Sequence, residues 1–240
     1  MTVTINAAAL GSVAPLVNIP FDDWRPCFVA SLSAGATYGQ AGTVVTVTST
    51  AHGIPALCNG SDWYWPGSAA IPAGVYKDWT YVTVDTFTFT NPVAQTIAAG
   101  TAVLNVPMTS IVMLKSATVP RGVVSENGQL TLHASRRGDS TANIKRIYLI
   151  IDGNQNCSIA SAGTSNTATC AMTIRGLGSS KPNTYVYSSG GNADSLGASS
   201  QTRQTIDFSA DKTAYLALFV TAAQQWTGVD MAFLEARKWQ

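Results

Sequence analysis

A chain of 240 residues is long enough to bury a sizeable core, and its formal net charge of +1 provides no field to attract nucleic acid or an acidic membrane. Only 11% of the residues are charged, against about 25% in an average globular protein. Such a polar but uncharged surface favours a protein whose faces lie against other subunits, because few charges then need desolvation. No apolar run approaches the roughly 18 residues of a membrane span, so we expect no membrane insertion and no nucleic-acid partner.

Residues 1–40 show no clean periodicity and contain three prolines, which oppose a long helix. We expect this segment to form an extended N-terminal arm that packs on a partner. Its first 21 residues carry no charge and lack the basic start of a signal peptide, so we expect synthesis and assembly in the cytoplasm. The apolar residues expected to anchor the arm are Val13, Leu16, Val17, Ile19, Trp24 and Phe28.

Residues 41–106 form a second segment, rich in threonine, which we expect to be a small β-barrel-like module. Val45 and Val47 alternate with threonines, as in a half-buried strand. Residues 81–84 and 87–90 alternate too, but the apolar positions change from even to odd across Asp85-Thr86. A continuous strand would keep its parity, so this change predicts a tight hairpin. Asn91-Pro92 is expected to close the unit, and residues 102–106 form either a last strand or a connector.

Residues 107–240 are expected to form a jelly-roll-like β-sandwich. The runs at 146–151 and 214–220 are continuously apolar, which is typical of strands buried on both faces. Shorter strands are expected at 130–134, 169–174, 184–187, 204–208 and 231–236, separated by Gly, Asn and Ser turns such as the one at 126–128. Residues 222–225 are the only plausible helical turn. The sequence therefore predicts an all-β fold.

Four segments of the small module together resemble a β module that recurs in phage tail and fibre proteins. They are Gly42–Thr48, Ala51-His52-Gly53, Gly74-Val75-Tyr76 and Val84–Phe89. In that module a threonine-rich strand runs into a His-Gly turn, and a Thr-Phe-Thr-Phe strand closes the barrel.

A longer series of segments resembles a jelly-roll domain of phage virion proteins. In chain order they are Val119-Pro120, 127–130, 145–147, 174–176, 205–208, 228–230 and 233–235. The two resemblances imply a virion protein with other virion proteins as partners, and a homo-oligomer with a trimer favoured. They leave the position in the particle open.

No group of residues predicts catalysis, a metal site or a cofactor. His52 precedes a glycine at a turn, and His133 lies on the polar face of a strand, so both fit structural roles. The segment 152–157 begins like a calcium loop but has Cys157 where that loop needs glycine. None of the four cysteines forms a Cys-x-x-Cys pair; we expect free thiols, although Cys157 and Cys170 could meet across a hairpin.

An aromatic cluster in a loop-rich stretch is the best candidate for a binding site. It consists of Trp63, Tyr64, Trp65, Tyr76 and Trp79. Rings of this size are costly to leave in water, so they either cap the core of the small module, the favoured interpretation, or bind a partner. If exposed, they would also stack on sugars of a host surface.

Taken together, these features predict a non-enzymatic structural component of a bacteriophage virion. We expect it in the tail, the fibre base or the adsorption apparatus, where it acts through protein–protein contacts. One alternative is a capsid decoration or head-fibre protein. The other is a glycan-binding module that recognises a receptor.

Overall fold

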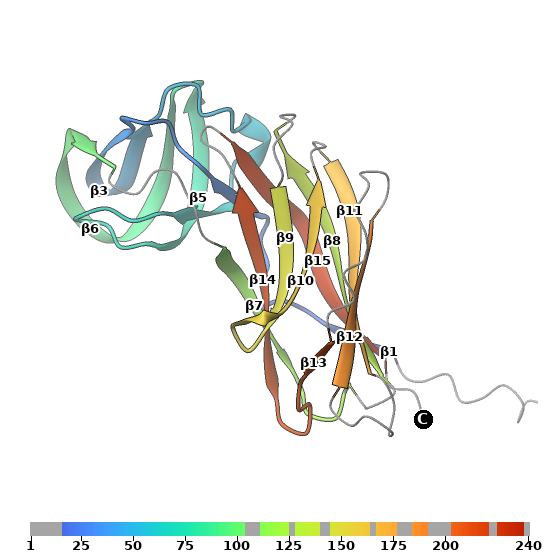
Figure 1. Cartoon of the computed structure of the whole chain (residues 1–240). Helices are drawn as coiled ribbons and strands as arrows, with labels where there is room; N and C mark the ends of the chain where they lie inside the picture. Colours follow the sequence, from blue (N-terminus) through green and yellow to red (C-terminus); the bar gives the residue numbers. More distant parts are fainter. Residues whose placement is uncertain are drawn as a thin grey trace, which may run out of the picture.

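The computed structural model describes residues 16–103, 111–124, 128–139, 145–163, 167–176, 184–191, 203–220 and 225–237. These residues form an all-β protein (Figure 1) whose one helical element is the short 3-10 helix η2 (Ala56–Cys58). The strands are β1 (Leu16–Ile19), β2 (Cys27–Ala30), β3 (Thr37–Thr48), β4 (Asp62–Trp65), β5 (Gly74–Thr83), β6 (Thr86–Ala102), β7 (Val112–Val119), β8 (Gln129–Gly138), β9 (Lys145–Ile151), β10 (Asn154–Gly163), β11 (Thr167–Gly176), β12 (Thr184–Gly191), β13 (Arg203–Thr205), β14 (Lys212–Val220) and β15 (Trp226–Arg237). No helix among the described residues is long and apolar enough to cross a membrane.

The strands form two sheets. The larger has the order β13-β12-β11-β8-β15-β2-β4-β5-β6-β3, with β1 also paired to β15, and the smaller has the order β10-β9-β14-β7. Strands β13, β12, β11, β8 and β15 of the large sheet face the small sheet and make a β-sandwich with it. Strands β3 to β6, at the other end of the large sheet, form the small module at the upper left of Figure 1. The all-β prediction is therefore confirmed. Most strands of the sandwich, β7 to β15, follow the module in the chain, whereas β1 and β2 precede it.

The sandwich has an aliphatic core between its two sheets. Leu130 and Leu132 of β8 alternate toward it from the large sheet, and Leu149 of β9 and Leu216 of β14 meet them from the small one. The central strand β9 is also buried on its outer face, where Tyr148 and Ile150 belong to a further cluster, so the prediction for the run 146–151 is confirmed. On the outer face of β14 only Ala217 is buried, and Tyr215 and Phe219 are half-buried, so the prediction for the run 214–220 is confirmed in part.

The small module has an aromatic core instead. Val45 and Val47 of β3 alternate toward it, opposite Phe89 and Phe87 of β6, and all four side chains are buried. The chain turns between β5 and β6 at residues 84–85, which confirms the hairpin expected from the change in parity. Strand β6 continues past Asn91-Pro92 to Ala102, however, because its second half pairs with the first half of β3.

Strand β2 joins the two cores. It pairs antiparallel with β15 and parallel with β4. Its alternate side chains point to opposite sides: Cys27 and Val29 enter the sandwich core, whereas Phe28 and Ala30 enter the module core. Gly228 of β15 permits the close approach, because a Cβ there would lie 2.9 Å from the Cβ of Phe28. One four-residue strand therefore serves two hydrophobic cores.

The placement of β1 and β2 corrects the expectation of an extended arm for residues 16–40, whereas residues 1–15 lie outside the described residues. Ile19 and Phe28 are buried in the chain's own cores, Trp24 packs against the sandwich core, and β1 pairs with the end of β15. Val17 is exposed, Leu16 opens β1, and Val13 lies outside the described residues. The segment lacks visible periodicity because its strands are only four residues long and one of them is buried on both faces.

Several other predictions fall wholly or partly outside the described residues. They concern the turn at 126–128, the helical turn at 222–225 and the segment 104–106; for the pairing of Cys157 with Cys170, the structure describes the backbone of β10 and β11 but not the two side chains. Cys27 and Cys58, in contrast, are buried free thiols. Burial raises the pKa of the Cys27 thiol to about 12 and that of Cys58 to about 11.

Candidate functional site

The aromatic cluster lies inside the small module. Trp63, Trp65 and Trp79 are 0% exposed and pack edge-on or tilted against Phe87 and Phe89. This placement corrects the interpretation of these tryptophans as a binding surface for a partner or a glycan, because no ring reaches solvent, and it agrees with the core-capping interpretation.

The two tyrosines of the cluster differ from the tryptophans. Tyr76 is also buried in the module, and its hydroxyl donates a hydrogen bond to the carbonyl of Pro72 at 3.0 Å. Tyr64 is half-buried and packs against the sandwich core. It points away from the tryptophans because neighbouring residues of a strand face opposite sides.

His52 has a structural position. The backbone N–H of Ile54 donates to Nδ1 at 3.1 Å, so the ring proton is on Nε2, which donates to the carbonyl of Thr83 at 2.9 Å. Burial lowers the pKa of His52, and its ring packs edge-on against Phe87. With both nitrogens engaged and the neutral form favoured, His52 braces the β5–β6 hairpin.

A pocket of about 290 Å³ lies on the curled ribbon of β3 and β6. Its walls are residues 37–41, Thr46 and Thr48 of β3 and Ile97, Ala99 and Gly100 of β6. This lining holds no carboxylate, histidine, cysteine or cation, and its groups of the kinds used in acid–base or nucleophilic catalysis are the hydroxyls of Tyr38, Thr37, Thr46 and Thr48. Among the described residues no group of three or more His, Cys, Asp or Glu side chains is placed to hold a metal ion.

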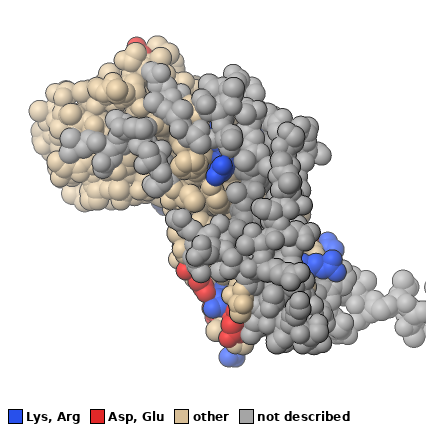
Figure 2. Space-filling model, viewed as in Figure 1, with Lys and Arg blue, Asp and Glu red and all other residues tan. Residues whose placement is uncertain are grey.

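The distribution of charge separates the module from the sandwich. Residues 31–103 contain only four charged side chains: Asp62, Lys77, Asp78 and Asp85. The first three lie in ion pairs at the junction with the rest of the chain. Asp85 remains, and it accepts a hydrogen bond from the N–H of Ala51 beside the β5–β6 turn. Figure 2 accordingly shows the visible face of the module as almost wholly uncharged.

The centre of the junction is a buried ion pair between Asp62 of β4 and Lys115 of β7. Lys115 Nζ lies 2.5 Å from Asp62 Oδ2 and donates a second hydrogen bond to the carbonyl of Asp23 at 3.0 Å. The two side chains are only 2% and 6% exposed. A buried ion pair is stable only where the geometry compensates the lost hydration of both charges. The pair therefore ties the module to the sandwich in one defined arrangement.

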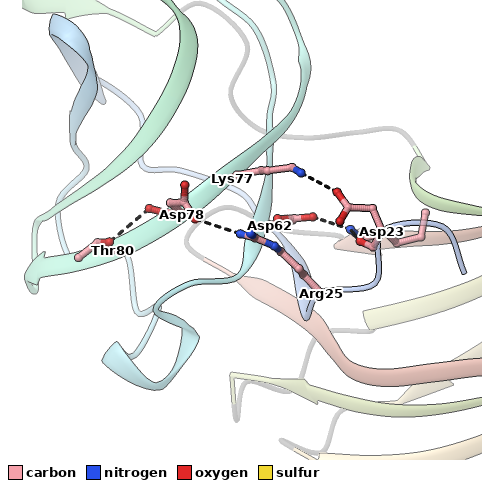
Figure 3. A network of polar contacts seen from close by, with 7 residues as sticks. Asp23, Arg25, Asp62, Lys77, Asp78 and Thr80 are labelled. Carbon is pink, nitrogen blue, oxygen red and sulfur yellow. Dashed lines mark hydrogen bonds and ion pairs between the residues drawn. The ribbon is translucent and has the colours of Figure 1, made fainter.

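Two exposed ion pairs flank this centre. Lys77 Nζ lies 2.5 Å from Asp23 Oδ2, and Arg25 donates to Asp78 at 3.0 Å (Figure 3). The hydrogen bond and charge of Lys77 lower the pKa of Asp23, and the hydrogen bond to Asp78 raises that of Arg25. These contacts join the loop before β2 to strand β5, so every charge of the module except Asp85 serves the junction.

The outer face of the module carries threonine and valine. The strand register aligns Thr46 of β3 with Thr88 of β6, and Thr88 with Thr80 of β5. A second row aligns Thr48, Thr86 and Thr83. Val44, Val82, Val84 and Val93 are exposed around these rows. The module thus presents hydroxyl and methyl groups where a typical surface presents mixed charges.

Sequence reasoning missed the junction entirely. Asp62 and Lys115 are 53 residues apart, and neither belongs to a motif. The only feature of the sequence that could have pointed to these two residues is the scarcity of charge, because each of the few charged residues in such a segment has a higher chance of a structural role.

In comparisons with known proteins, no protein-family model, no curated protein and no solved structure matches the chain.

Proposed function

We propose that this chain is a non-enzymatic structural component of a bacteriophage virion, in the tail, the fibre base or the adsorption apparatus. The observation that carries the proposal is the partition of charge: three of the module's four charges lie in ion pairs at the junction, and the two threonine rows of its outer face carry no charge. Interface cores are depleted of charged residues relative to the rest of a protein surface. The assignment to a phage is supported by the resemblance of the two segment series described above.

The junction supports the same proposal. A structural protein that holds two neighbouring subunits in a fixed relative orientation needs a fixed angle between its two contact surfaces. Strand β2 links the two cores through the backbone, and the buried Asp62–Lys115 pair adds a contact that is satisfied in only one arrangement. The module is therefore suited to present its outer face at a set angle to the sandwich.

A capsid decoration or head-fibre protein would use the same features, so it remains the alternative position in the particle. The glycan-binding alternative depended on the tryptophan rings, and these are buried.

The proposal is tested on purified phage particles that encode the chain. We expect the chain in the particles at a fixed copy number, and density or antibody labelling at the tail. Labelling on the head would favour the alternative position, and absence from purified particles would refute the proposal.

A matched pair of variants tests the role of the outer face. Val82 in the module and Met231 on the sandwich are 51% and 53% exposed, so a lysine at either position disturbs neither core. We expect Val82→Lys to reduce incorporation into particles and Met231→Lys to leave it unchanged. Equal incorporation of the two variants would contradict the assignment of the contact to the outer face.

A further inference from the structure

Strand β3 forms one of the two edges of the large sheet in the described part of the chain. It stands at the end of the strand order, and in the described part of the chain it pairs with β6 alone. Every second residue of such an edge directs its N–H and C=O groups away from the sheet. Edges of this kind are templates for another strand unless charges, prolines or irregularities protect them.

Among the described residues, the regular part of this edge shows none of these protections. Residues 44–48 read Val-Val-Thr-Val-Thr, with no charge, no proline and no glycine. These five residues pair with β6 without interruption, whereas the register between β3 and β6 shifts just before them, between Gly42 and Val44. Val45 and Val47 are buried in the module, and Thr46 and Thr48 are exposed on the outer face. The segment therefore combines high β propensity with an open set of backbone groups.

We infer that the edge of β3 pairs antiparallel with the same strand of a second copy of this chain. A two-fold axis at Thr46, the centre of the regular segment, places Thr46 opposite Thr46 of the second copy and Val45 opposite its Val47. In this register the inner faces of the two sheets lie on one side and their outer faces on the other. A shift of the pairing by one residue would place outward-facing residues opposite inward-facing ones. It also continues the row of Thr46, Thr88 and Thr80 across the axis.

The chemistry of the segment favours a second copy over a different partner. An isologous contact requires a surface that complements itself, and like charges opposite each other would prevent it. The five residues carry no charge, so nothing repels the second strand, and no charge selects a partner of opposite sign either. This inference rests on the proposed function for its premise that the outer face makes protein contacts.

The test uses the full-length protein and sedimentation velocity. At micromolar concentration we expect the sedimentation of the native protein to correspond to a dimer, with twice the chain mass of 25.1 kDa. Thr46→Lys and Thr46→Glu each place two like charges at the two-fold axis, so each variant should dissociate at least tenfold more readily. An equimolar mixture of the two variants should recover the dimer, because lysine then faces glutamate.

Thr80→Lys is the matched control. Thr80 lies in the same threonine row on the same face, but on β5, whose other edge is occupied at this point because the neighbouring Trp79 exchanges backbone hydrogen bonds with Gly60 and Ser61. This variant should remain a dimer, and near-ultraviolet circular dichroism should show that all three variants keep the native core.

A monomeric native protein, a trimer, or Thr46 variants that associate like the native chain would each overturn the inference. Failure of the mixture to recover the dimer would overturn the two-fold register. A monomer that is nevertheless found in phage particles would refute the self-pairing and leave the proposed function standing, whereas a dimer absent from particles would do the reverse.

Discussion

Removing Lys115 from the buried ion pair should destabilise the protein strongly. In Lys115→Met the side chain keeps a similar length and volume, so no large cavity forms. The carboxylate of Asp62, only 2% exposed, loses its contact at 2.5 Å. Its other oxygen, Oδ1, already has no hydrogen-bond partner among the described residues. The variant therefore leaves a buried and unpaired charge at the junction.

The magnitude follows from the burial of both partners. Breaking a buried ion pair from one side costs about 3–5 kcal/mol, whereas exposed pairs contribute about 0–1 kcal/mol. For a chain of this size a loss of that order lowers the melting temperature by roughly 6–20 °C. Replacing both partners, as in Asp62→Leu with Lys115→Met, removes both charges and should recover much of the loss.

Urea unfolding of the single and double variants measures these differences. Lys77→Met is the control, because the Lys77–Asp23 pair belongs to the same network but is exposed on both sides. A loss below about 1 kcal/mol for Lys115→Met, the range of an exposed pair, would refute the view that this contact fixes the junction. A double variant no more stable than Lys115→Met would also contradict it.

Three further predictions concern buried side chains. Burial lowers the pKa of His52, so its neutral form stabilises the fold fully above the unfolded value of 6.5, and this contribution is lost as the pH falls below it. His52→Gln should therefore flatten the decline of the unfolding free energy between pH 6.5 and 5, and an unchanged decline would contradict the burial of the ring. The pKa values of Cys27 and Cys58 are raised to about 12 and about 11, so both thiols should resist iodoacetamide at pH 8 in the native protein and react after unfolding. Peptide mapping measures this difference, and alkylation of the native protein at the rate of a free thiol would contradict their burial. Trp63→Ala should cost about 3–5 kcal/mol in urea unfolding, and a loss no larger than that of the exposed Leu57→Ala would mean that the ring is not in the core.

The strands that could be predicted are those whose side chains alternate over several residues. Val45 and Val47 in β3 and the opposite parity of Phe87 and Phe89 in β6 identified the two strands and the turn between them. The continuous apolar run of β9 identified a strand buried on both faces. Strands β1, β2 and β4 escaped prediction, because four residues are too few to show a period.

The candidate site was less predictable than the fold. The aromatic cluster at Trp63 and Trp65 was recognised, and two roles for it were open on sequence alone. Burial decided between them, because the rings pack edge-on or tilted against Phe87 and Phe89, which belong to a strand more than twenty positions later in the chain. The junction depends on a lysine 53 residues from its carboxylate, and no local pattern marks either residue.

By itself, the sequence determined that this is an all-β protein with a threonine-rich module and a larger sandwich, since strand periodicity and turn residues are local properties. The tertiary structure alone decided that β2 serves both cores, that the tryptophans are buried, and that three of the module's four charges lie at the junction. These features arise from contacts between residues far apart in the chain. Their energies depend on burial and geometry, which exist only once the sheets have assembled.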